Sequence, residues 1–394
     1  MPIYLDHNAT TPLAEGVLDA MLPYLRDQYG NASSAHSLGR AARAAVEQAR
    51  ERVAELVNAQ PQQIIFTGSG TEANNLAIKG VAAQYKKGRL LISAVEHASV
   101  RSPAQALTEQ GWDLDTLPVD ILGRVTSAAL QEHLHPDTRL VSIMLANNET
   151  GVLQDIASLS KATHKAGRSR HPASRDTSTS LYVGIVFHTD ATQAAGKIKV
   201  DFAALGVQLM SLSAHKLYGP KGVGALVVSD GVELQPLIHG GGKTLRGGSE
   251  NVAAIAGFGA AAELATKELE QRAVYLLGLR DYLEQRLHEI PSLVIFAEQA
   301  ERLPNTVLCS IPEFSGETLI ENLDHKGICV SSGSACTSGS FQPSHVLVAM
   351  GVERRLQQNV LRISLGMGNT RNDIDYFIAS LQGLIIRFKP WAAA

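Results

Sequence analysis

The chain is most informative at Ser211-Leu212-Ser213-Ala214-His215-Lys216-Leu217-Tyr218-Gly219-Pro220-Lys221-Gly222, where a short apolar run ends in a lysine and a Gly/Pro turn. Hydroxyl side chains and an imidazole precede this lysine. An amine at the end of a buried strand is costly unless it has a partner, and an aldehyde that takes it as a Schiff base is a suitable one. Lys216 is therefore the first candidate for chemistry.

An aspartate ends a second apolar run, in Phe187-His188-Thr189-Asp190-Ala191-Thr192-Gln193. Pyridoxal phosphate chemistry needs a lysine for the aldehyde and a carboxylate that keeps the pyridine nitrogen protonated. The two segments together predict pyridoxal 5'-phosphate as the cofactor, with Lys216 on the aldehyde and Asp190 at the ring nitrogen.

Length and composition describe an ordinary globular protein. With 394 residues, 45% hydrophobic and 19% charged, the chain is long enough for two domains. The net charge of -3 gives no reason to expect nucleic acid or an anionic membrane as a partner. No stretch could span a bilayer, and Met1-Pro2-Ile3-Tyr4-Leu5-Asp6 lacks the features of a signal peptide. Three cysteines without metal-site spacing indicate a reducing, cytoplasmic location and no metal.

Apolar runs alternate with amphipathic stretches over the first two-thirds of the chain. Strands are predicted at 63–66, 90–93, 140–145, 181–187, 209–212 and 224–228, and helices at 41–58 and 71–85. This rhythm predicts an α/β fold with a mostly parallel sheet between two layers of helices. A long helical pattern over 252–290 then leads into a mixed region, so we expect a large cofactor-binding domain at 16–259. A smaller α+β domain is expected from residues 1–15 and 260–394.

A glycine-rich turn feeds a predicted helix at Thr67-Gly68-Ser69-Gly70-Thr71-Glu72-Ala73-Asn74-Asn75. The free amides at the helix start, with Thr71 as a cap, would seat a phosphate. A plain capped helix explains the turn equally well when it is considered alone. Because the cofactor needs such a seat, we assign the phosphate to Gly70 and Thr71, with Ser213 and His215 as further donors.

Polar residues also follow two other predicted strands. His97, in Glu96-His97-Ala98-Ser99, can stack on the cofactor ring and move protons, although most histidines are structural. Asn148 and Gln193 could bond the phenolic oxygen of the cofactor, or could be ordinary residues of a turn at a strand end. We expect all three side chains at the carboxyl edge of the sheet.

The cysteines differ in their surroundings. Cys336 lies in the small, polar stretch Val330-Ser331-Ser332-Gly333-Ser334-Ala335-Cys336-Thr337-Ser338-Gly339-Ser340, which suits an exposed, reactive thiol. Cys309 and Cys329 lie in apolar runs and are expected in the core. Arg362 interrupts an apolar strand, where it either binds a substrate carboxylate or forms an internal salt bridge.

One stretch differs from its surroundings: residues 168–180, which are polar and basic between a predicted helix and a predicted strand. A few residues would suffice for this connection. We expect a solvated surface loop that is dispensable for folding and cofactor binding, and contact with a partner is the alternative.

These segments together resemble the NifS/IscS-like cysteine desulfurases, which belong to fold type I of the pyridoxal phosphate enzymes. The resemblance covers nearly the whole chain. It is carried by Tyr4-Leu5-Asp6-His7-Asn8-Ala9-Thr10-Thr11, Gly70-Thr71-Glu72-Ala73-Asn74-Asn75-Leu76, Glu96-His97, Asn147-Asn148-Glu149-Thr150-Gly151, His188-Thr189-Asp190-Ala191-Thr192-Gln193, Ser213-Ala214-His215-Lys216, Arg362-Ile363-Ser364-Leu365-Gly366 and the Cys336 stretch.

The resemblance implies a fold and a set of roles. It implies a seven-stranded, mostly parallel sheet and a homodimer in which Ser249 reaches the phosphate of the partner subunit. In the site, Lys216 holds the cofactor aldehyde, Asp190 the ring nitrogen and His97 the ring face. Gln193 and Asn148 lie at the ring edge, and Gly70, Thr71, Ser213 and His215 at the phosphate. Arg362, with Asn148, binds the substrate, and Cys336 carries the persulfide.

The expected reaction converts L-cysteine to L-alanine and leaves sulfur on Cys336 for an acceptor protein. Iron–sulfur cluster assembly, tRNA thiolation and DNA modification all fit as the pathway that receives the sulfur. Residues 168–180 are unusual for the IscS group, and selenocysteine lyases carry extra residues at this joint, so selenocysteine lyase is the alternative. An aminotransferase or a silent cofactor-binding scaffold would have no use for Cys336.

Overall fold

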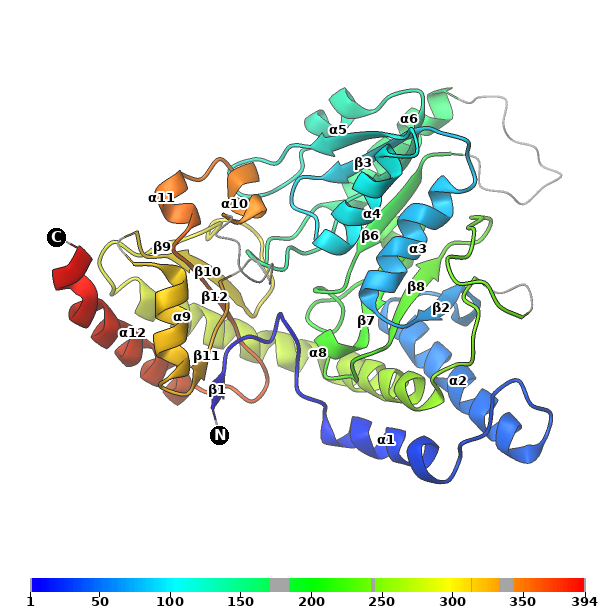
Figure 1. Cartoon of the computed structure of the whole chain (residues 1–394), viewed down its shortest axis with the longest axis horizontal. Coiled ribbons are helices and arrows are strands. Elements are labelled where there is room, and N and C mark those ends of the chain that lie inside the picture. The colour runs from blue at the N-terminus through cyan, green and yellow to red at the C-terminus, as the bar shows by residue number, and fades with distance from the viewer. Residues whose placement is uncertain (1, 171–183, 242–244, 313, 333–342, 393–394) are drawn as a thin grey trace.

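The computed structural model describes residues 2–170, 184–241, 245–312, 314–332 and 343–392. A seven-stranded sheet in the order β2-β8-β7-β6-β5-β3-β4 forms its centre (Figure 1). Its strands are β2 (Ile64–Thr67), β3 (Arg89–Ser93), β4 (Asp113–Leu117), β5 (Thr138–Ser142), β6 (Val186–Asp190), β7 (Leu209–Ser213) and β8 (Gly224–Val228). Strands β3 to β7 pair in parallel, whereas β8 is antiparallel to both β2 and β7. The prediction of a mostly parallel α/β sheet is confirmed.

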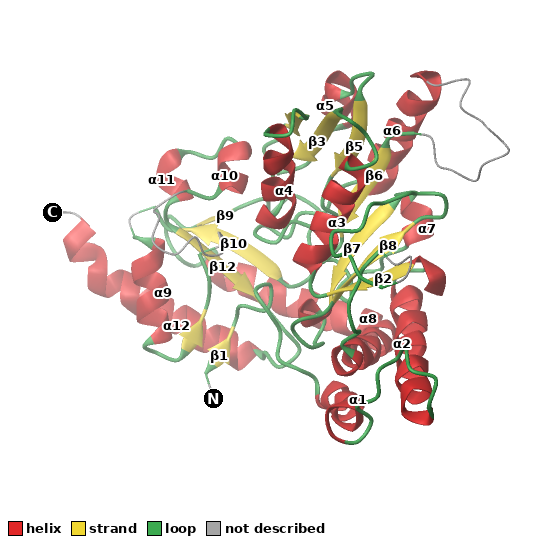
Figure 2. Ribbon diagram, turned by 45° about the vertical axis from the view of Figure 1, so that its right-hand side comes forward, coloured by secondary structure: helices red, strands yellow, loops and turns green. Residues whose placement is uncertain are grey.

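Helices cover both faces of this sheet because its strands bury side chains on both sides (Figure 2). Leu91 and Phe187 belong to the core that includes residues of α2, α5, α6 and α8, whereas their neighbours Leu90 and Val186 belong to the core that includes residues of α3 and α4. The helices of this part are α1 (Glu15–Arg26), α2 (Ser37–Leu56), α3 (Gly70–Ala82), α4 (Ala98–Thr108), α5 (Ser127–His133), α6 (Ile156–Arg170), α7 (Phe202–Leu205) and α8 (Val252–Leu287), with single turns η1 (Pro61–Gln63) and η2 (Ala214–Lys216).

The rest of the chain forms two small sheets beside the large one (Figure 1). Strands β9 (Val294–Ile295), β10 (Thr306–Ser310) and β12 (Val360–Ser364) are antiparallel. Strand β1 (Ile3–Tyr4) pairs in parallel with β11 (Ile328–Cys329), so the N-terminal segment joins this part of the molecule. The helices here are α9 (Gly316–Asp324), α10 (His345–Ala349), α11 (Arg354–Gln357) and α12 (Arg371–Ala392).

Helix α8 connects the two parts. Phe258 near its start belongs to the core under the large sheet, and Leu283 near its end belongs to a second core with Leu5 and Phe377. The proposed division between residues 259 and 260 therefore lies within one continuous helix and stays a prediction. Among the described residues, no helix is both long and apolar enough to cross a membrane.

Three strands differ from the prediction. Strand β5 runs from Thr138 to Ser142, whereas the prediction was 140–145. Strand β4 was missed because its sequence, Asp113-Leu114-Asp115-Thr116-Leu117, carries charge at the edge of the sheet, where Arg89 pairs with Asp113 and Asp115. Strand β6 begins at Val186 and runs on to Asp190, whereas the prediction was 181–187. Residues 184 and 185 precede the strand, and residues 181–183 of the predicted range lie outside the described residues. The end of β6 at Asp190 is what places that carboxylate at the carboxyl edge of the sheet.

Candidate active site

Several of the predicted site residues lie at the carboxyl ends of β6 and β7. Asp190 ends β6, Ser213 ends β7, and Lys216 follows in η2. The start of α3 lies directly against them, because a Cβ on Gly70 would lie 3.1 Å from Ser213 Cβ and 3.1 Å from Thr192 Oγ1. A side chain at this position would require Ser213 or Thr192 to shift by a few tenths of an ångström.

The cap of α3 differs from the prediction. Ser69, rather than Thr71, is the N-cap, and its Oγ accepts a hydrogen bond from Glu72 N at 3.1 Å. Thr71 lies in the first turn with its side chain exposed. Its hydroxyl is therefore not used by the cap and remains available to a ligand at the helix start.

Thr192 adds a donor that the sequence did not single out. Its Oγ1 is buried and has no hydrogen-bond partner among the described residues. A buried hydroxyl normally finds a partner, and this one lies beside Gly70 at the start of α3, where an anion is favoured. The unpaired hydroxyl and the cradle at Gly70 fit a bound phosphate group.

His215 lies at the same end of β7. Its Nδ1 is 3.1 Å from Thr10 Oγ1. Burial, followed by the charges of Lys216 and Lys221, lowers the pKa of His215 to about 4. The imidazole is therefore neutral at pH 7 and can donate only one ring N–H.

Asp190 is held by groups that donate to its carboxylate. Thr192 N donates to Oδ1 at 2.9 Å, and Asn74 Nδ2 donates to Oδ2 at 2.7 Å. Asn74 also donates to Ser99 Oγ at 2.8 Å, which ties Asp190 to the start of α4. These two hydrogen bonds fix the orientation of the carboxylate that would face a ring nitrogen. Asn74 was not singled out from the sequence, although it lies one helical turn after Gly70.

Lys216 is a half-buried residue whose amine contacts carbonyl oxygens. Its Nζ donates to Asn8 O at 2.5 Å and to Ala9 O at 2.7 Å. Burial and then the charge of Arg362 lower the pKa of Lys216 from 10.5 to about 8, against the opposing effect of the carboxylates Asp190 and Asp6. An amine with this pKa is partly unprotonated near neutral pH and can act as a nucleophile or base.

His97 is the N-cap of α4, and its Nδ1 accepts a hydrogen bond from Ser99 N at 3.1 Å. Burial lowers the pKa of His97 more than nearby Asp190 raises it. The imidazole is consequently neutral, and the acceptor role of Nδ1 places its proton on Nε2. His97 can therefore exchange a proton at Nε2 while the helix cap holds the ring.

Arg362 is 1% exposed and forms an ion pair with Asp6, whose Oδ1 is 2.7 Å from its Nη2. Its Nη1 donates to the backbone oxygen of Asn148 at 3.1 Å. The salt bridge that the sequence left open as an alternative is therefore present. Gln193 lies nearby, where its Nε2 donates to Asn8 O at 2.9 Å.

The segment before Ser249 is tied to the start of α3. Arg246 donates to Glu72 Oε1 at 3.1 Å, and Glu72 Oε2 accepts from Gly68 N at 2.8 Å. Ser249 itself is exposed on this chain.

Cys336 lies outside the described residues, but both flanks of its segment contact the site. Ser331 pairs with the backbone of Arg362, and Ser344 Oγ donates to Glu149 Oε2 at 2.5 Å. His345 Nε2 lies 3.0 Å from Glu96 O, one residue before His97. The flanks of the segment are thus fixed to the strand of Arg362 and to the turns that carry Asn148 and His97.

The other cysteines are placed in the structure. Cys309 is fully buried, as predicted, and burial raises the pKa of its thiol to about 12. The prediction for Cys329 was wrong, because this residue is partly exposed on a two-residue strand with Sγ 4.0 Å from Asp324 Oδ1.

Glu96 gives a testable pH dependence. Its buried Oε1 accepts from Ser93 Oγ at 2.6 Å and from Met144 N at 2.7 Å, whereas Oε2 has no hydrogen-bond partner among the described residues. Burial raises the pKa of Glu96 from 4.5 to about 8. The folded state therefore holds a proton that the unfolded state releases, so this group loses stabilising effect as pH rises from 4.5 to 8.

We expect Glu96→Gln, which resembles the protonated acid, to gain stability relative to the native chain between pH 5 and pH 8, by at most ~1.4 kcal/mol per pH unit. Denaturant unfolding at several pH values measures this difference. Glu109→Gln, at an exposed position on the C-terminal side of α4, is the control and should show no such trend. A pH-independent difference for Glu96→Gln would contradict the assignment.

Comparison with known proteins identifies the family. The sequence profile of the aminotransferase class V family matches residues 3–171 and 177–377. The chain belongs to the aminotransferase class V family. The interruption of the match, residues 172–176, falls within the polar stretch 168–180.

Named relatives align with almost the entire length of this chain. The protein named cysteine desulfurase IscS from Dictyoglomus turgidum is 43% identical over 392 residues, 98% of this chain and 95% of the relative. Cysteine desulfurase IscS 1 from Archaeoglobus fulgidus is 41% identical over 390 residues, 98% of this chain and 97% of the relative. A solved NifS-like protein, 36% identical, superposes with a TM-score of 0.88 over 98% of this chain and 99% of its own. The resemblance to the NifS/IscS-like group and its fold is confirmed.

Proposed function

We propose that this chain is a pyridoxal phosphate-dependent cysteine desulfurase that converts L-cysteine to L-alanine and passes the sulfur on through Cys336. The observation that carries the proposal is the half-buried amine of Lys216, with a pKa lowered to about 8, at the same strand edge as the hydrogen-bonded carboxylate of Asp190. The names of the full-length relatives support the same activity.

The residues present fit the cofactor. Lys216 would bind the aldehyde and Asp190 the pyridine nitrogen, and His97 would stack on the ring. Gln193 and Asn148 would lie at the ring edge. The phosphate would accept hydrogen bonds from groups at or near the start of α3. These are Gly70, Thr71, Ser213, His215 and the unpaired hydroxyl of Thr192.

When bound, pyridoxal phosphate supplies an electron sink for the Cα–H bond of the amino acid. In the proposed reaction Lys216 Nζ moves the proton from Cα, and His97 exchanges a proton with a thiol through Nε2. The Cys336 thiolate attacks the substrate sulfur, so an S–S bond forms as the Cβ–S bond breaks. The Cβ atom gains a proton, alanine leaves, and no external oxidant is needed.

Arg362 is proposed to bind the substrate carboxylate. Its guanidinium already pairs with Asp6 at 2.7 Å, so a substrate carboxylate must bind beside Asp6 or displace it. The backbone carbonyl of Asn148 holds Nη1 at 3.1 Å and keeps the guanidinium oriented in either case.

The activity is tested by product analysis. Purified chain loaded with pyridoxal phosphate should form equal amounts of alanine and sulfide from L-cysteine in the presence of a small thiol. Keto-acid formation without sulfide would instead indicate an aminotransferase. Rates on L-cysteine and L-selenocysteine, measured side by side, distinguish the desulfurase from a selenocysteine lyase. The unpaired thiols of Cys309 and Cys329 suit the proposed reducing, cytoplasmic location.

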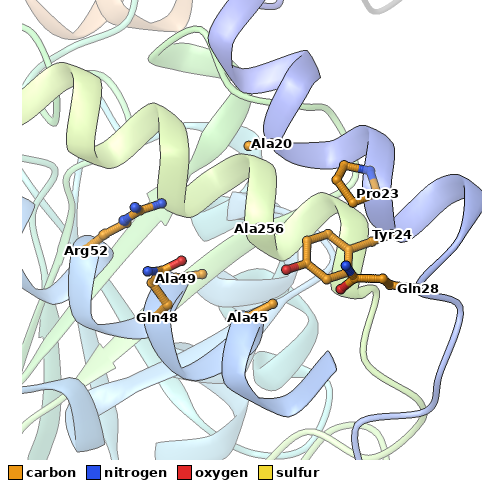
Figure 3. A pocket seen from close by; sticks show the side chains of 9 residues that line it. All are labelled: Ala20, Pro23, Tyr24, Gln28, Ala45, Gln48, Ala49, Arg52 and Ala256. Carbon is orange, nitrogen blue, oxygen red and sulfur yellow. The ribbon is translucent and has the colours of Figure 1, made fainter. Parts of the chain in front are cut away.

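We also propose that the chain works as a homodimer in which Ser249 reaches the phosphate site of the partner subunit. The exposed position of Ser249 supports this arrangement. Apolar side chains on the surface of α1 and its flank also suit a contact between subunits. Leu25 is 60% exposed, Tyr29 is 78% exposed, and Leu18 lies two turns before Leu25 on the same helix. A hollow of about 220 Å³ opens between α1, α2 and α8, where Tyr24 and Arg52 lie along its walls (Figure 3).

The polar stretch at residues 168–180 is proposed to be dispensable for cofactor binding. Its first three residues end α6, and residues 171–180 lie outside the described residues. Replacing residues 171–180 by a short Gly-Ser link should leave the visible absorbance of the bound cofactor unchanged. Precipitation or loss of cofactor would contradict this expectation. Retained alanine formation with a small thiol, but lost transfer to the natural acceptor protein, would indicate a partner-contact role.

A further inference from the structure

Lys197 is a buried lysine that the proposed reaction does not use. It is 6% exposed, and its Nζ donates at 2.8 Å both to Asn8 Oδ1 and to Gln193 Oε1. No carboxylate among the described residues forms an ion pair with it. Burial, followed by the charges of Lys216 and Arg362, lowers the pKa of Lys197 well below its usual value. Burying a lysine without a carboxylate partner costs free energy, so the hydrogen bonds to its neighbours must offset that cost.

The amine determines which way the two side-chain amides face. The Nζ of Lys197 donates to both amides, so Asn8 and Gln193 turn their oxygens toward it. Asn305 Nδ2 reinforces this for Asn8, because it donates to the same Oδ1 at 3.2 Å. The amide nitrogen of Gln193 therefore points away from Lys197.

The orientation of the Gln193 amide affects Lys216 because both side chains donate to the backbone carbonyl of Asn8. Gln193 Nε2 donates to Asn8 O at 2.9 Å, and Lys216 Nζ donates to the same oxygen at 2.5 Å. If the Gln193 amide turned over, its oxygen would face the carbonyl oxygen of Asn8, which is repulsive. The terminal torsion of glutamine allows such a turn unless hydrogen bonds prevent it.

We propose that Lys197 is a positioning residue that keeps the donor end of Gln193 toward the cofactor site and holds the Asn8 carbonyl in place for Lys216. This inference rests on the proposed function, in which Gln193 lies at the phenolic edge of pyridoxal phosphate. The phenolic oxygen is an acceptor when ionised, so the glutamine must offer it Nε2 rather than Oε1. Lys197 itself touches neither the cofactor nor the substrate.

The test is Lys197→Met, which keeps an apolar chain of similar length and removes the donors. Lys199→Met makes the same change at an exposed position two residues later and is the matched control. For Lys197→Met we expect the dissociation constant of pyridoxal phosphate to rise on the order of tenfold, the effect of losing about one hydrogen bond. We also expect the midpoint of the pH titration of the bound cofactor's absorbance to rise, because an ionised oxygen loses a donor.

A double-mutant comparison separates positioning from general packing. Gln193→Leu should shift the titration midpoint in the same direction, and Lys197→Met combined with Gln193→Leu should shift it no further than Gln193→Leu alone. A Lys197→Met variant that loses thermal stability but keeps the native midpoint would overturn the proposal, as would additive shifts in the double variant. If Lys197→Met does not fold, Lys197→Leu, which also removes the donors to Asn8 and Gln193, is judged by the same criteria.

A crystal structure of the cofactor-free Lys197→Met protein at about 1.2 Å resolution or better, where amide nitrogen and oxygen can be told apart, tests the inference independently of the cofactor. The Gln193 amide should leave the orientation in which Nε2 faces Asn8 O, and an unchanged amide with unchanged partners would overturn the positioning role. If the native chain fails to bind pyridoxal phosphate at all, the proposed function is wrong, while this structural result still decides the role of Lys197.

Discussion

Replacing Lys216 by alanine is expected to abolish turnover of L-cysteine, with a loss on the order of 10³-fold or more, because it removes both the attachment point of the cofactor and the base at Cα. No other lysine of the described residues ends a buried strand beside the start of α3. Lys197, a second lysine at this site, donates hydrogen bonds to the side chains of Asn8 and Gln193. Lys221→Ala, at an exposed position five residues later, is the control and should keep its activity.

The attachment point of the cofactor can be identified directly. Borohydride reduction of the loaded native chain, followed by peptide mapping, should place the label on the peptide that contains Lys216. In cofactor-free protein, modification of Lys216 by an amine reagent should reach half its maximal rate near pH 8 rather than near pH 10.5, because burial lowers the pKa of the amine. Label on a different lysine would overturn the assignment.

Most of the fold could be predicted because its strands are short, apolar and separated by helices. β7 and β8 were predicted to within one residue, since both are buried on both faces and read as continuous apolar runs. β4 could not be predicted in this way, because an edge strand stabilised by Arg89 needs no apolar run. Residues 184 and 185 were predicted in β6 because the apolar pattern extends upstream of the residues that pair with β5.

The candidate site could be predicted where it depends on strand ends and could not where it depends on packing between elements. Lys216 and Asp190 follow buried runs, and the parallel sheet brings these ends together. Asn74 and Lys197 carry no such signal, since only the folded chain shows that one holds Asp190 and the other orients Gln193. Cys329 was misplaced because an apolar run of only two paired residues does not bury its side chain.

A comparison of the three cysteines in the chain indicates which thiol carries the sulfur. Cys309 is fully buried, and a thiol with a pKa raised to about 12 does not supply a thiolate near neutral pH. Burial and the neighbouring carboxylates of Asp324 and Asp6 also raise the pKa of Cys329. Cys336 remains, and the flanks of its segment are fixed beside Arg362, Glu149 and Glu96.

Replacing Cys336 by serine is therefore expected to abolish sulfur transfer from L-cysteine while cofactor binding stays intact, because a hydroxyl cannot form the persulfide. Alanine and sulfide formation measure the loss, and the visible absorbance of the loaded protein measures the cofactor. Cys329→Ser, which changes the partly exposed thiol near Asp324, is the matched control and should retain activity. Desulfurase turnover retained in Cys336→Ser, or lost in Cys329→Ser alone, would show that the sulfur is carried elsewhere, since both variants keep the Lys216 site unchanged.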